Sequence, residues 1–150
     1  MKRTAARRSA WKTRLMRPKC SVLRTGTSFA AYPNVPLRLL IVDDEAVLRK
    51  HLARLLAQRG YDVATAGTCA EALSALARNP VEILLLDIEL PDGDGLGLLA
   101  ALDQQQRPRH TIVMTACAPE RVLGARRLNV RQVLHKPLDL EQLVEALPGV

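Results

Sequence analysis

Apolar and polar positions along residues 37–150 fall into a regular order that predicts five strands, each followed by a helix. The third expected strand, VEILLLD (81–87), has five apolar residues among its first six and ends at an acidic residue. A short, continuous apolar run is typical of a strand that is buried on both faces. Between the strands, apolar residues recur three and four positions apart, which indicates amphipathic helices.

The expected elements account for the whole of this region. We expect strands at 37–44, 61–66, 81–87, 110–116 and 130–135, and helices at 45–60, 69–79, 95–105, 119–129 and 139–147. Thr68 and Asp139 are placed to cap two of the helices, Pro119 to begin the fourth and Gly60 to end the first. The apolar residues expected to face the core from the first two helices are Val47, Leu48, Leu52, Leu55, Leu56, Ala72, Leu73 and Leu76.

Strict alternation of strands and helices favours an α/β fold in which a parallel sheet has helices on both faces. Five strand–helix units occupy residues 37–150 and leave no room for a second domain. We therefore predict a flavodoxin-like, doubly wound (βα)5 domain with the strand order 2-1-3-4-5. In that order the ligand crevice lies at the carboxyl ends of strands one and three.

Chemically distinctive residues stand at these carboxyl ends. Asp43 and Asp44 end the first strand and Asp87 the third, while Thr115 ends the fourth and Lys136 follows the fifth. Converging carboxylates repel one another unless a cation joins them, and a donor set made only of oxygen suits Mg²⁺. A hydroxyl and an ammonium group can bind phosphate oxygens. Together the residues are suited to phosphoryl transfer onto a carboxylate.

The excess of basic charge lies at one end of the chain. The 150 residues carry 22 Lys and Arg against 15 Asp and Glu, a net charge of +7. Ten of the basic residues and no acidic one lie in residues 1–38, so residues 39–150 have a net charge of −3. We interpret residues 1–36 as a disordered basic segment, either a solvated tail or translated upstream sequence. Nucleic-acid contact through Trp11, binding to anionic lipid and a transit peptide are the alternatives.

Other function classes find no support in the sequence. Cys20, Cys69 and Cys117 have none of the spacings of a zinc site and are expected to be free thiols in a reducing cytoplasm. No apolar run approaches the roughly 18 residues of a membrane span, and the first residues contain no secretory signal. The glycine-rich GDGLG (93–97) lacks the spacing of a nucleotide-binding loop.

Residues 37–147 resemble the receiver domain of two-component response regulators. The matching motifs, in the family's order and spacing, are LLIVDDE (39–45), LLLDIELPDGDGLGLL (84–99), MTA (114–116) and HKP (135–137). The resemblance implies a receiver domain at 37–150 that is phosphorylated by a sensor histidine kinase or a histidine phosphotransfer protein. It also implies a Mg²⁺-dependent reaction and an output through protein contact or phosphate relay.

The resemblance implies a role in phosphoryl chemistry for several residues. Asp87 would be the phospho-acceptor, Thr115 would bind a phosphoryl oxygen, and Lys136 would pair with the phosphoryl group. Glu89 and Cys117 occupy the positions that tune how fast the phosphoryl group is lost.

A metal site follows from the same resemblance. Asp44 would ligate Mg²⁺ directly and Asp43 through water, with Asp87 and the backbone carbonyl of Glu89 completing the protein ligands. In the family the bond that corresponds to Lys136–Pro137 is often cis.

The sequence departs from the family pattern at its switch position. Three residues before the lysine the family usually has Tyr or Phe, whereas this chain has Val133, and Tyr61 is the only aromatic residue of the expected domain. The fourth unit is about one residue shorter than usual, and Asn129 replaces a glycine at a helix end, where it can adopt the left-handed conformation. We therefore expect phosphorylation to be retained and signalling through an aromatic side chain to be lost.

The remaining expectations concern partners and competing functions. The chain ends after the fifth helix, which suggests a stand-alone receiver that acts by protein contact, as a relay or as a drain on a kinase, with homodimerisation left open. None of His51, His110 and His135 is expected to be a phosphotransfer histidine. His51 is expected on the surface where kinases dock, and His135 is expected to face solvent. A nucleic-acid or membrane binder that uses residues 1–36 is one alternative. A small phosphohydrolase is another, although Glu89 replaces the aspartate of its motif, and we expect no turnover of an external substrate.

Overall fold

The computed structural model describes residues 35–116 and 119–149, and the structural statements below concern these residues. Apart from Val35 and Pro36, the predicted basic segment lies outside them, as do Cys20 and Cys117. The strands are β1 (Arg38–Val42), β2 (Asp62–Ala66), β3 (Ile83–Asp87), β4 (Glu89–Leu90), β5 (Gly93–Asp94), β6 (His110–Thr115) and β7 (Gln132–His135). The helices are α1 (Ala46–Gln58), α2 (Cys69–Arg78), α3 (Gly95–Ala101), α4 (Pro119–Val122), α5 (Leu140–Ala146) and a 3₁₀-helix, η2 (Ala125–Leu128).

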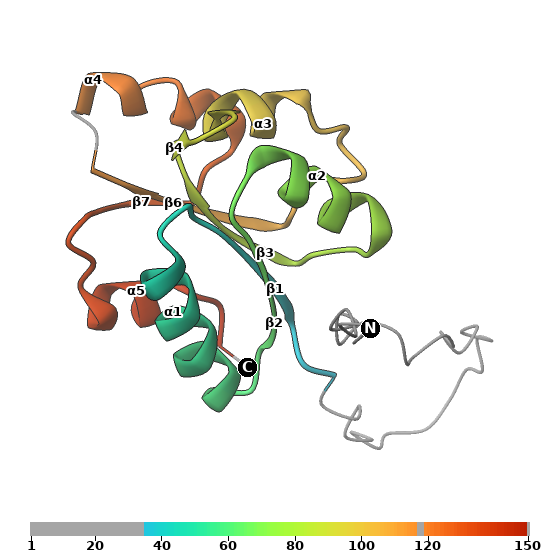
Figure 1. Cartoon of the computed structure of the whole chain (residues 1–150), viewed down its shortest axis with the longest axis vertical. Coiled ribbons are helices and arrows are strands. Elements are labelled where there is room, and N and C mark those ends of the chain that lie inside the picture. The colour runs from blue at the N-terminus through green and yellow to red at the C-terminus, as the bar shows by residue number, and fades with distance from the viewer. Residues whose placement is uncertain (1–34, 117–118, 150) are drawn as a thin grey trace, which may run out of the picture. The chain divides into compact units, whose positions relative to one another are not determined.

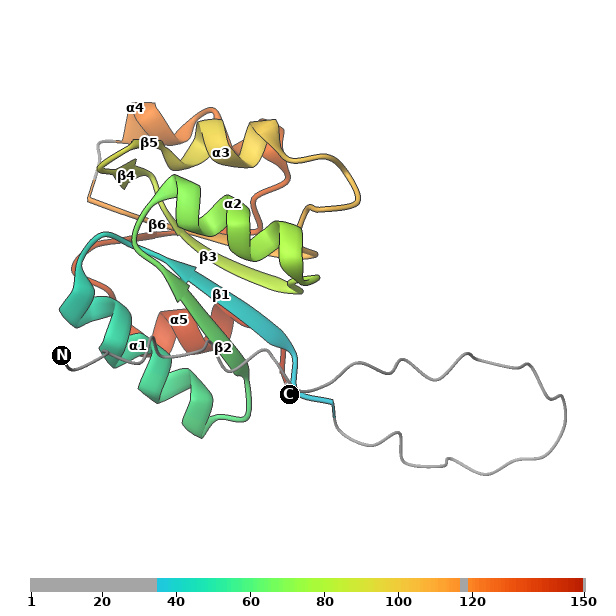
Figure 2. The same ribbon diagram turned by 45° about the vertical axis from the view of Figure 1, so that its right-hand side comes forward.

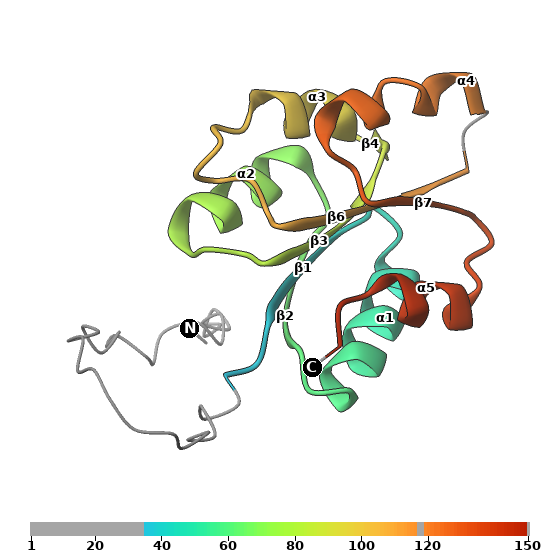
Figure 3. The same cartoon turned by 180° about the vertical axis from the view of Figure 1, so that it is seen from behind.

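The larger sheet contains five parallel strands in the order β2-β1-β3-β6-β7. Counted along the chain without the short β4 and β5, this is the order 2-1-3-4-5, so the predicted doubly wound α/β fold is confirmed. Helices α1 and α5 cover one face of the sheet, and α2 and α3 cover the other (Figure 1, Figure 3). A third direction of view shows the same layers (Figure 2).

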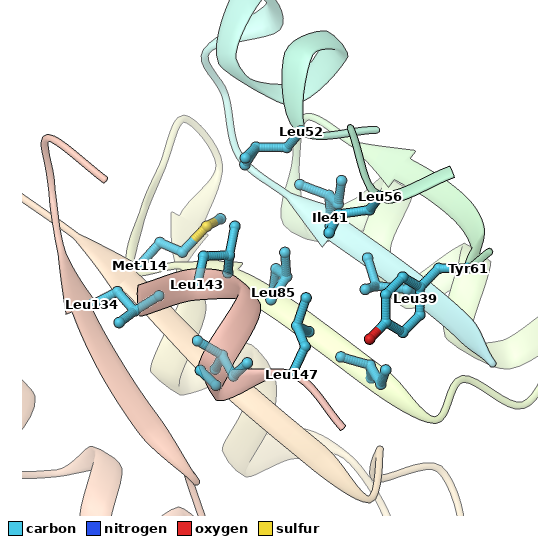
Figure 4. Close-up of a cluster of buried hydrophobic side chains, with 13 residues drawn as sticks. Leu39, Ile41, Leu52, Leu56, Tyr61, Leu85, Met114, Leu134, Leu143 and Leu147 are labelled. Atoms are coloured by element: carbon cyan, nitrogen blue, oxygen red, sulfur yellow. The ribbon is translucent and has the colours of Figure 1, made fainter. Parts of the chain in front are cut away.

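Alternate residues of the central strands point to opposite faces and form two cores. On the face covered by α1 and α5, Leu39 and Ile41 of β1 and Leu85 of β3 pack with Leu52 of α1 and Leu143 of α5 (Figure 4). All five side chains are completely buried. Through this core the first and last helices of the domain, α1 and α5, pack against the same face of the sheet.

The opposite core lies under α2 and α3. Leu40 and Val42 of β1 and Leu86 of β3 pack with Leu76 of α2 and Leu98 of α3. Because the middle strands contribute to both cores, they contain no alternating polar residues, as their continuous apolar runs predicted.

The predicted helix-end signals operate as expected. Thr68 Oγ1 accepts a hydrogen bond from the Glu71 amide at 3.1 Å, and the Asp139 carboxylate accepts one from the Glu141 amide at 2.9 Å. Gly60, just after α1, has a φ of 91°. Among the described residues, no helix has the length and hydrophobicity to cross a membrane.

Two residues predicted to face the core are exposed instead. Val47 is 77% exposed and Leu73 is 42% exposed. In α1 the inward-facing stripe runs through Leu48, Leu52 and Leu56, which are four residues apart. Val47 is turned by about 100° from Leu48 around the helix axis, which places it outside that stripe.

The fourth predicted helix is wrong in its length. Only Pro119–Val122 is α-helical, and the chain resumes as the 3₁₀-helix η2 after Gly124. Glycine weakens a helix interior, which explains the break. Asn129 ends this segment with a φ of 61°, as predicted. Helix α3 also ends early, at Ala101, because no apolar residue after Leu102 extends its buried face.

Replacing Leu52 with alanine is expected to lower the free energy of unfolding by about 2–5 kcal/mol, because a fully buried side chain leaves a cavity. Replacing Val47 on the same helix is expected to change it by less than about 0.5 kcal/mol, because that side chain is largely exposed. Urea denaturation followed by circular dichroism measures both changes. Equal losses in the two variants would contradict the orientation of α1.

Candidate functional site

Three carboxylates meet at the carboxyl edge of the sheet, as predicted. Asp43 follows β1 directly, and its amide donates to the Ala66 carbonyl at 3.1 Å, which ties it to the end of β2. Asp87 is the last residue of β3. Asp43 is fully buried and Asp87 is 4% exposed, whereas Asp44 is exposed. One carboxylate oxygen from each of these residues lies within 4.8 Å of the other two.

Lys136 brings a positive charge into this crevice. Its Nζ atom lies 2.8 Å from Asp87 Oδ2, to which it donates a hydrogen bond, and 2.7 Å from Asp43 Oδ2. The Lys136 amide donates to the Thr115 carbonyl at 2.8 Å, which anchors the lysine backbone beside the end of β6. The Lys136–Pro137 bond is cis, as the family resemblance suggested. One ammonium group therefore links the carboxyl ends of β1, β3 and β7.

Burial and charge act in opposite directions on the central ion pair. Burial raises the pKa of the Asp87 carboxyl group, while hydrogen bonds from Lys136 and from the Glu89 amide, at 3.1 Å, act to lower it. Burial alone would lower the pKa of Lys136, but the neighbouring carboxylates of Asp43 and Asp87 raise it. The lysine is thereby held in its charged form.

The acidic residues suit a hard cation. Asp43 Oδ1 accepts a hydrogen bond from the Glu45 amide at 2.8 Å, whereas the buried Oδ2 atom is held by its ion pair with Lys136 and accepts no directed hydrogen bond. A buried carboxylate oxygen without a directed hydrogen bond can also serve as a metal ligand. Together with Asp44 and Asp87 it gives a donor set made only of oxygen, which Mg²⁺ and Ca²⁺ prefer. The Glu89 carbonyl as a further ligand stays a prediction.

The other predicted residues surround this centre. Thr115 is fully buried at the end of β6, one residue beyond Met114, which is the register partner of Asp87. Glu89 points to the surface, where its carboxylate pairs with Arg121 of α4 at 3.0 Å. The Glu89 carboxylate is therefore paired with a residue of α4, close to the crevice.

Val133, the residue at the switch position, is part of an apolar cluster. It packs, half-buried, against the cluster formed by Ile88 and Val113, to which Leu96 and Val122 also belong. Because Ile88 directly follows Asp87, the side chain at position 133 borders the acidic strand end through apolar contacts.

The three histidines differ in their surroundings. His51 and His135 are exposed, in agreement with the prediction, and His110 is half-buried at the opposite end of β6. The His110 ring lies 3.1 Å from an Arg131 guanidinium nitrogen.

The loop after β3 contains interactions that sequence reasoning missed. Residues 89–90 pair with residues 93–94 in a small antiparallel ladder, β4–β5. Asp92, at its tip, accepts hydrogen bonds from the Cys69 amide at 2.7 Å and the Ala70 amide at 3.0 Å. It thus caps α2 from more than twenty residues away, and no local pattern reveals such a cap.

Gly95 closes the same loop against the strand end. Its amide donates to the Ile88 carbonyl at 2.8 Å. A Cβ atom added to Gly95 would collide with the Asp87 carbonyl oxygen and lie 3.2 Å from Ile88 Cα. Only glycine allows α3 to begin this close to Asp87.

Comparison with known sequences gives a consistent result. A family model described as the response regulator receiver domain matches residues 39–148. The transcriptional regulatory protein TrcR of Mycobacterium tuberculosis is 32% identical over 140 residues, which are 92% of this chain and 54% of TrcR. The positive alginate biosynthesis regulatory protein of Pseudomonas aeruginosa is 40% identical over 114 residues, covering 74% of this chain and 46% of that protein. The chain thus spans about half the length of these curated relatives.

Solved structures with the same fold include two response regulator proteins. One, from Burkholderia pseudomallei, was solved with a phosphorylated aspartic acid, a calcium ion and citrate. It is 31% identical with a TM-score of 0.69, over 75% of this chain and 66% of that one. A receiver protein from Pseudomonas putida is 28% identical with a TM-score of 0.70, over 75% of this chain and 95% of that one.

Replacing Gly95 with alanine is expected to lower the free energy of unfolding by about 1–3 kcal/mol, because the added methyl group collides with backbone. Gly97 of the same helix is the matched control, since a Cβ there lies 3.8 Å from its nearest neighbour. Gly97→Ala should raise the free energy of unfolding by about 0.5–1 kcal/mol. Thermal and urea unfolding measure both. A neutral Gly95→Ala would disprove the close approach to Asp87.

The cap by Asp92 is expected to weaken in acid. The hydrogen bonds from the Cys69 and Ala70 amides lower the pKa of the Asp92 carboxyl group, from about 3.9 in an unfolded chain. Its stabilising effect is therefore complete above that value and is lost as the pH falls through the lower, folded value. Urea midpoints of the wild type and Asp92→Asn, measured across this range, should differ at neutral pH and converge in acid. A difference that does not change with pH would contradict the prediction.

Proposed function

Because the chain belongs to the response regulator receiver domain family, we propose that it accepts a phosphoryl group on Asp87 in a two-component phosphorelay. The observation that supports this most strongly is the buried pair of carboxylates, Asp43 and Asp87, bridged by the ammonium group of Lys136. The proposed donor is a sensor histidine kinase or a histidine phosphotransfer protein, as is usual for receiver domains.

In the proposed reaction an Asp87 carboxylate oxygen attacks the phosphorus of a phosphohistidine. The new O–P bond forms as the N–P bond breaks, and the electron pair of the broken bond returns to the imidazole. Lys136, which already contacts Asp87 Oδ2 at 2.8 Å, is placed to neutralise charge on the transferred phosphoryl group. Thr115, at the neighbouring strand end, would bind a second phosphoryl oxygen.

Asp43, Asp44 and Asp87 would hold the cation that this reaction needs. Bound Mg²⁺ would supply positive charge against the phosphoryl oxygens. The buried Asp43 Oδ2 atom and the exposed Asp44 offer it one fixed and one adaptable oxygen donor. A related protein was solved with a calcium ion and a phosphorylated aspartic acid, which supports a divalent cation in this chain also.

The output proposed for the acyl phosphate is a protein contact or the transfer of phosphate to another histidine, in the cytoplasm. We expect no turnover of an external substrate, since Glu89 occupies the place where aspartate-based phosphohydrolases have a second aspartate. Glu89 would instead influence how long the phosphoryl group persists, and its pairing with Arg121 restrains it.

Incubation with acetyl phosphate and Mg²⁺ is expected to increase the intact mass by about 80 Da, one phosphoryl group. The increase should be absent in Asp87→Asn and in the presence of EDTA. Asp92→Asn is the matched control, because it makes the same chemical change in the loop after β3 without touching the crevice, and it should be labelled like the wild type. An unmodified wild type, under conditions that label a known receiver, would refute the proposal.

A further inference from the structure

Arg49 in the first turn of α1 is directed toward the acidic crevice. Its Nη1 atom donates a hydrogen bond to the backbone carbonyl of Asp43, and the side chain is half-buried. A cation in the first turn of a helix interacts unfavourably with the helix dipole. Helix stability therefore does not explain an arginine at this position. The contact with the Asp43 carbonyl does explain it.

The guanidinium group of Arg49 packs against Gly67, where the absence of a side chain leaves room for it. A Cβ atom added to Gly67, which follows β2, would lie 3.1 Å from Arg49 Nη1, 3.4 Å from Cζ and 3.5 Å from Nη2. Since all three atoms are this close, the planar end of Arg49 lies against the Gly67 backbone. Any side chain at position 67 would press on it.

Arg49 completes the restraint of Asp43. The Asp43 amide donates to Ala66 at 3.1 Å, its Oδ1 atom accepts from the Glu45 amide at 2.8 Å, and its carbonyl accepts from Arg49. These three contacts fix the carboxylate with Oδ2 turned into the crevice, where it lies 2.7 Å from Lys136 Nζ. A carboxylate fixed in this way loses little conformational freedom when it binds a metal ion.

We propose that Arg49 is a positioning residue for the divalent-cation site. It holds the Asp43 backbone in place and offsets the repulsion among the three carboxylates from a point outside the ligand set. This inference rests on the proposed function, because it assumes that Asp43, Asp44 and Asp87 bind Mg²⁺.

Titration calorimetry with MgCl₂ tests the role of Arg49. Arg49→Gln is expected to weaken Mg²⁺ binding about tenfold, the usual effect of removing a partner of a metal ligand. Arg54→Gln, which removes the same charge from an exposed position on α1, is the matched control and should bind like the wild type. Unfolding in EDTA should show both variants folded, so that lost binding reports on the site.

Gly67→Ala tests the same contact while Arg49 is retained. The added methyl group should displace the guanidinium group and weaken Mg²⁺ binding by a similar factor. In the Arg49→Gln background the same change should have no further effect, because the group that it displaces is gone. Additive losses in the double variant, or unchanged binding in Arg49→Gln, would overturn the inference. A wild type that binds no Mg²⁺ would instead refute the metal site of the proposed function.

Discussion

The ammonium group of Lys136 is the interaction on which the rest of the site depends. It lies within 2.8 Å of Asp43 and Asp87, two carboxylates with almost no exposure to solvent. Without a cation between them, buried carboxylates repel and one takes up a proton. The lysine opposes both effects. A lysine also suits the place better than an arginine, since its compact charge can contact one oxygen of each carboxylate.

The fold makes this interaction available over a long distance. Lys136 follows β7 at one edge of the sheet, whereas Asp43 follows β1 on the far side of β3 and β6. The lysine backbone is fixed to Thr115 at the end of β6, and its stem crosses that strand end to reach the carboxylates. The parallel arrangement is essential, because it places all these strand ends at one edge. The two apolar cores hold the strands in that register.

The sequence predicted the site better than its surroundings. Asp43, Asp87 and Lys136 could be found because each stands at the end of a strand, and the alternating pattern determines where parallel strand ends meet. Arg49 and Asp92 could not, because on the sequence they are one more polar residue of an amphipathic helix and one more acid in a turn; their roles depend on contacts between separate elements. Val47 was wrongly placed because an apolar residue beside a helical stripe looks the same as one within it. The short fourth helix shows a similar limit, since the apolar periodicity of the sequence continues across Gly124, where the α-helix itself is interrupted.

Val133 has a consequence for how this molecule can carry information. A branched aliphatic side chain is stiff at χ1, and here it is half-buried in the cluster that contains Ile88, Val113 and Val122. Its restricted χ1 makes Val133 poorly suited to a switch between two side-chain positions. Gly95, by contrast, begins α3 directly against the Asp87 backbone, so a backbone displacement at Asp87 would act on α3 without any side chain between them. Coupling between the acidic crevice and the surface would then depend on movement of the α3 backbone and not on a change of side-chain rotamer.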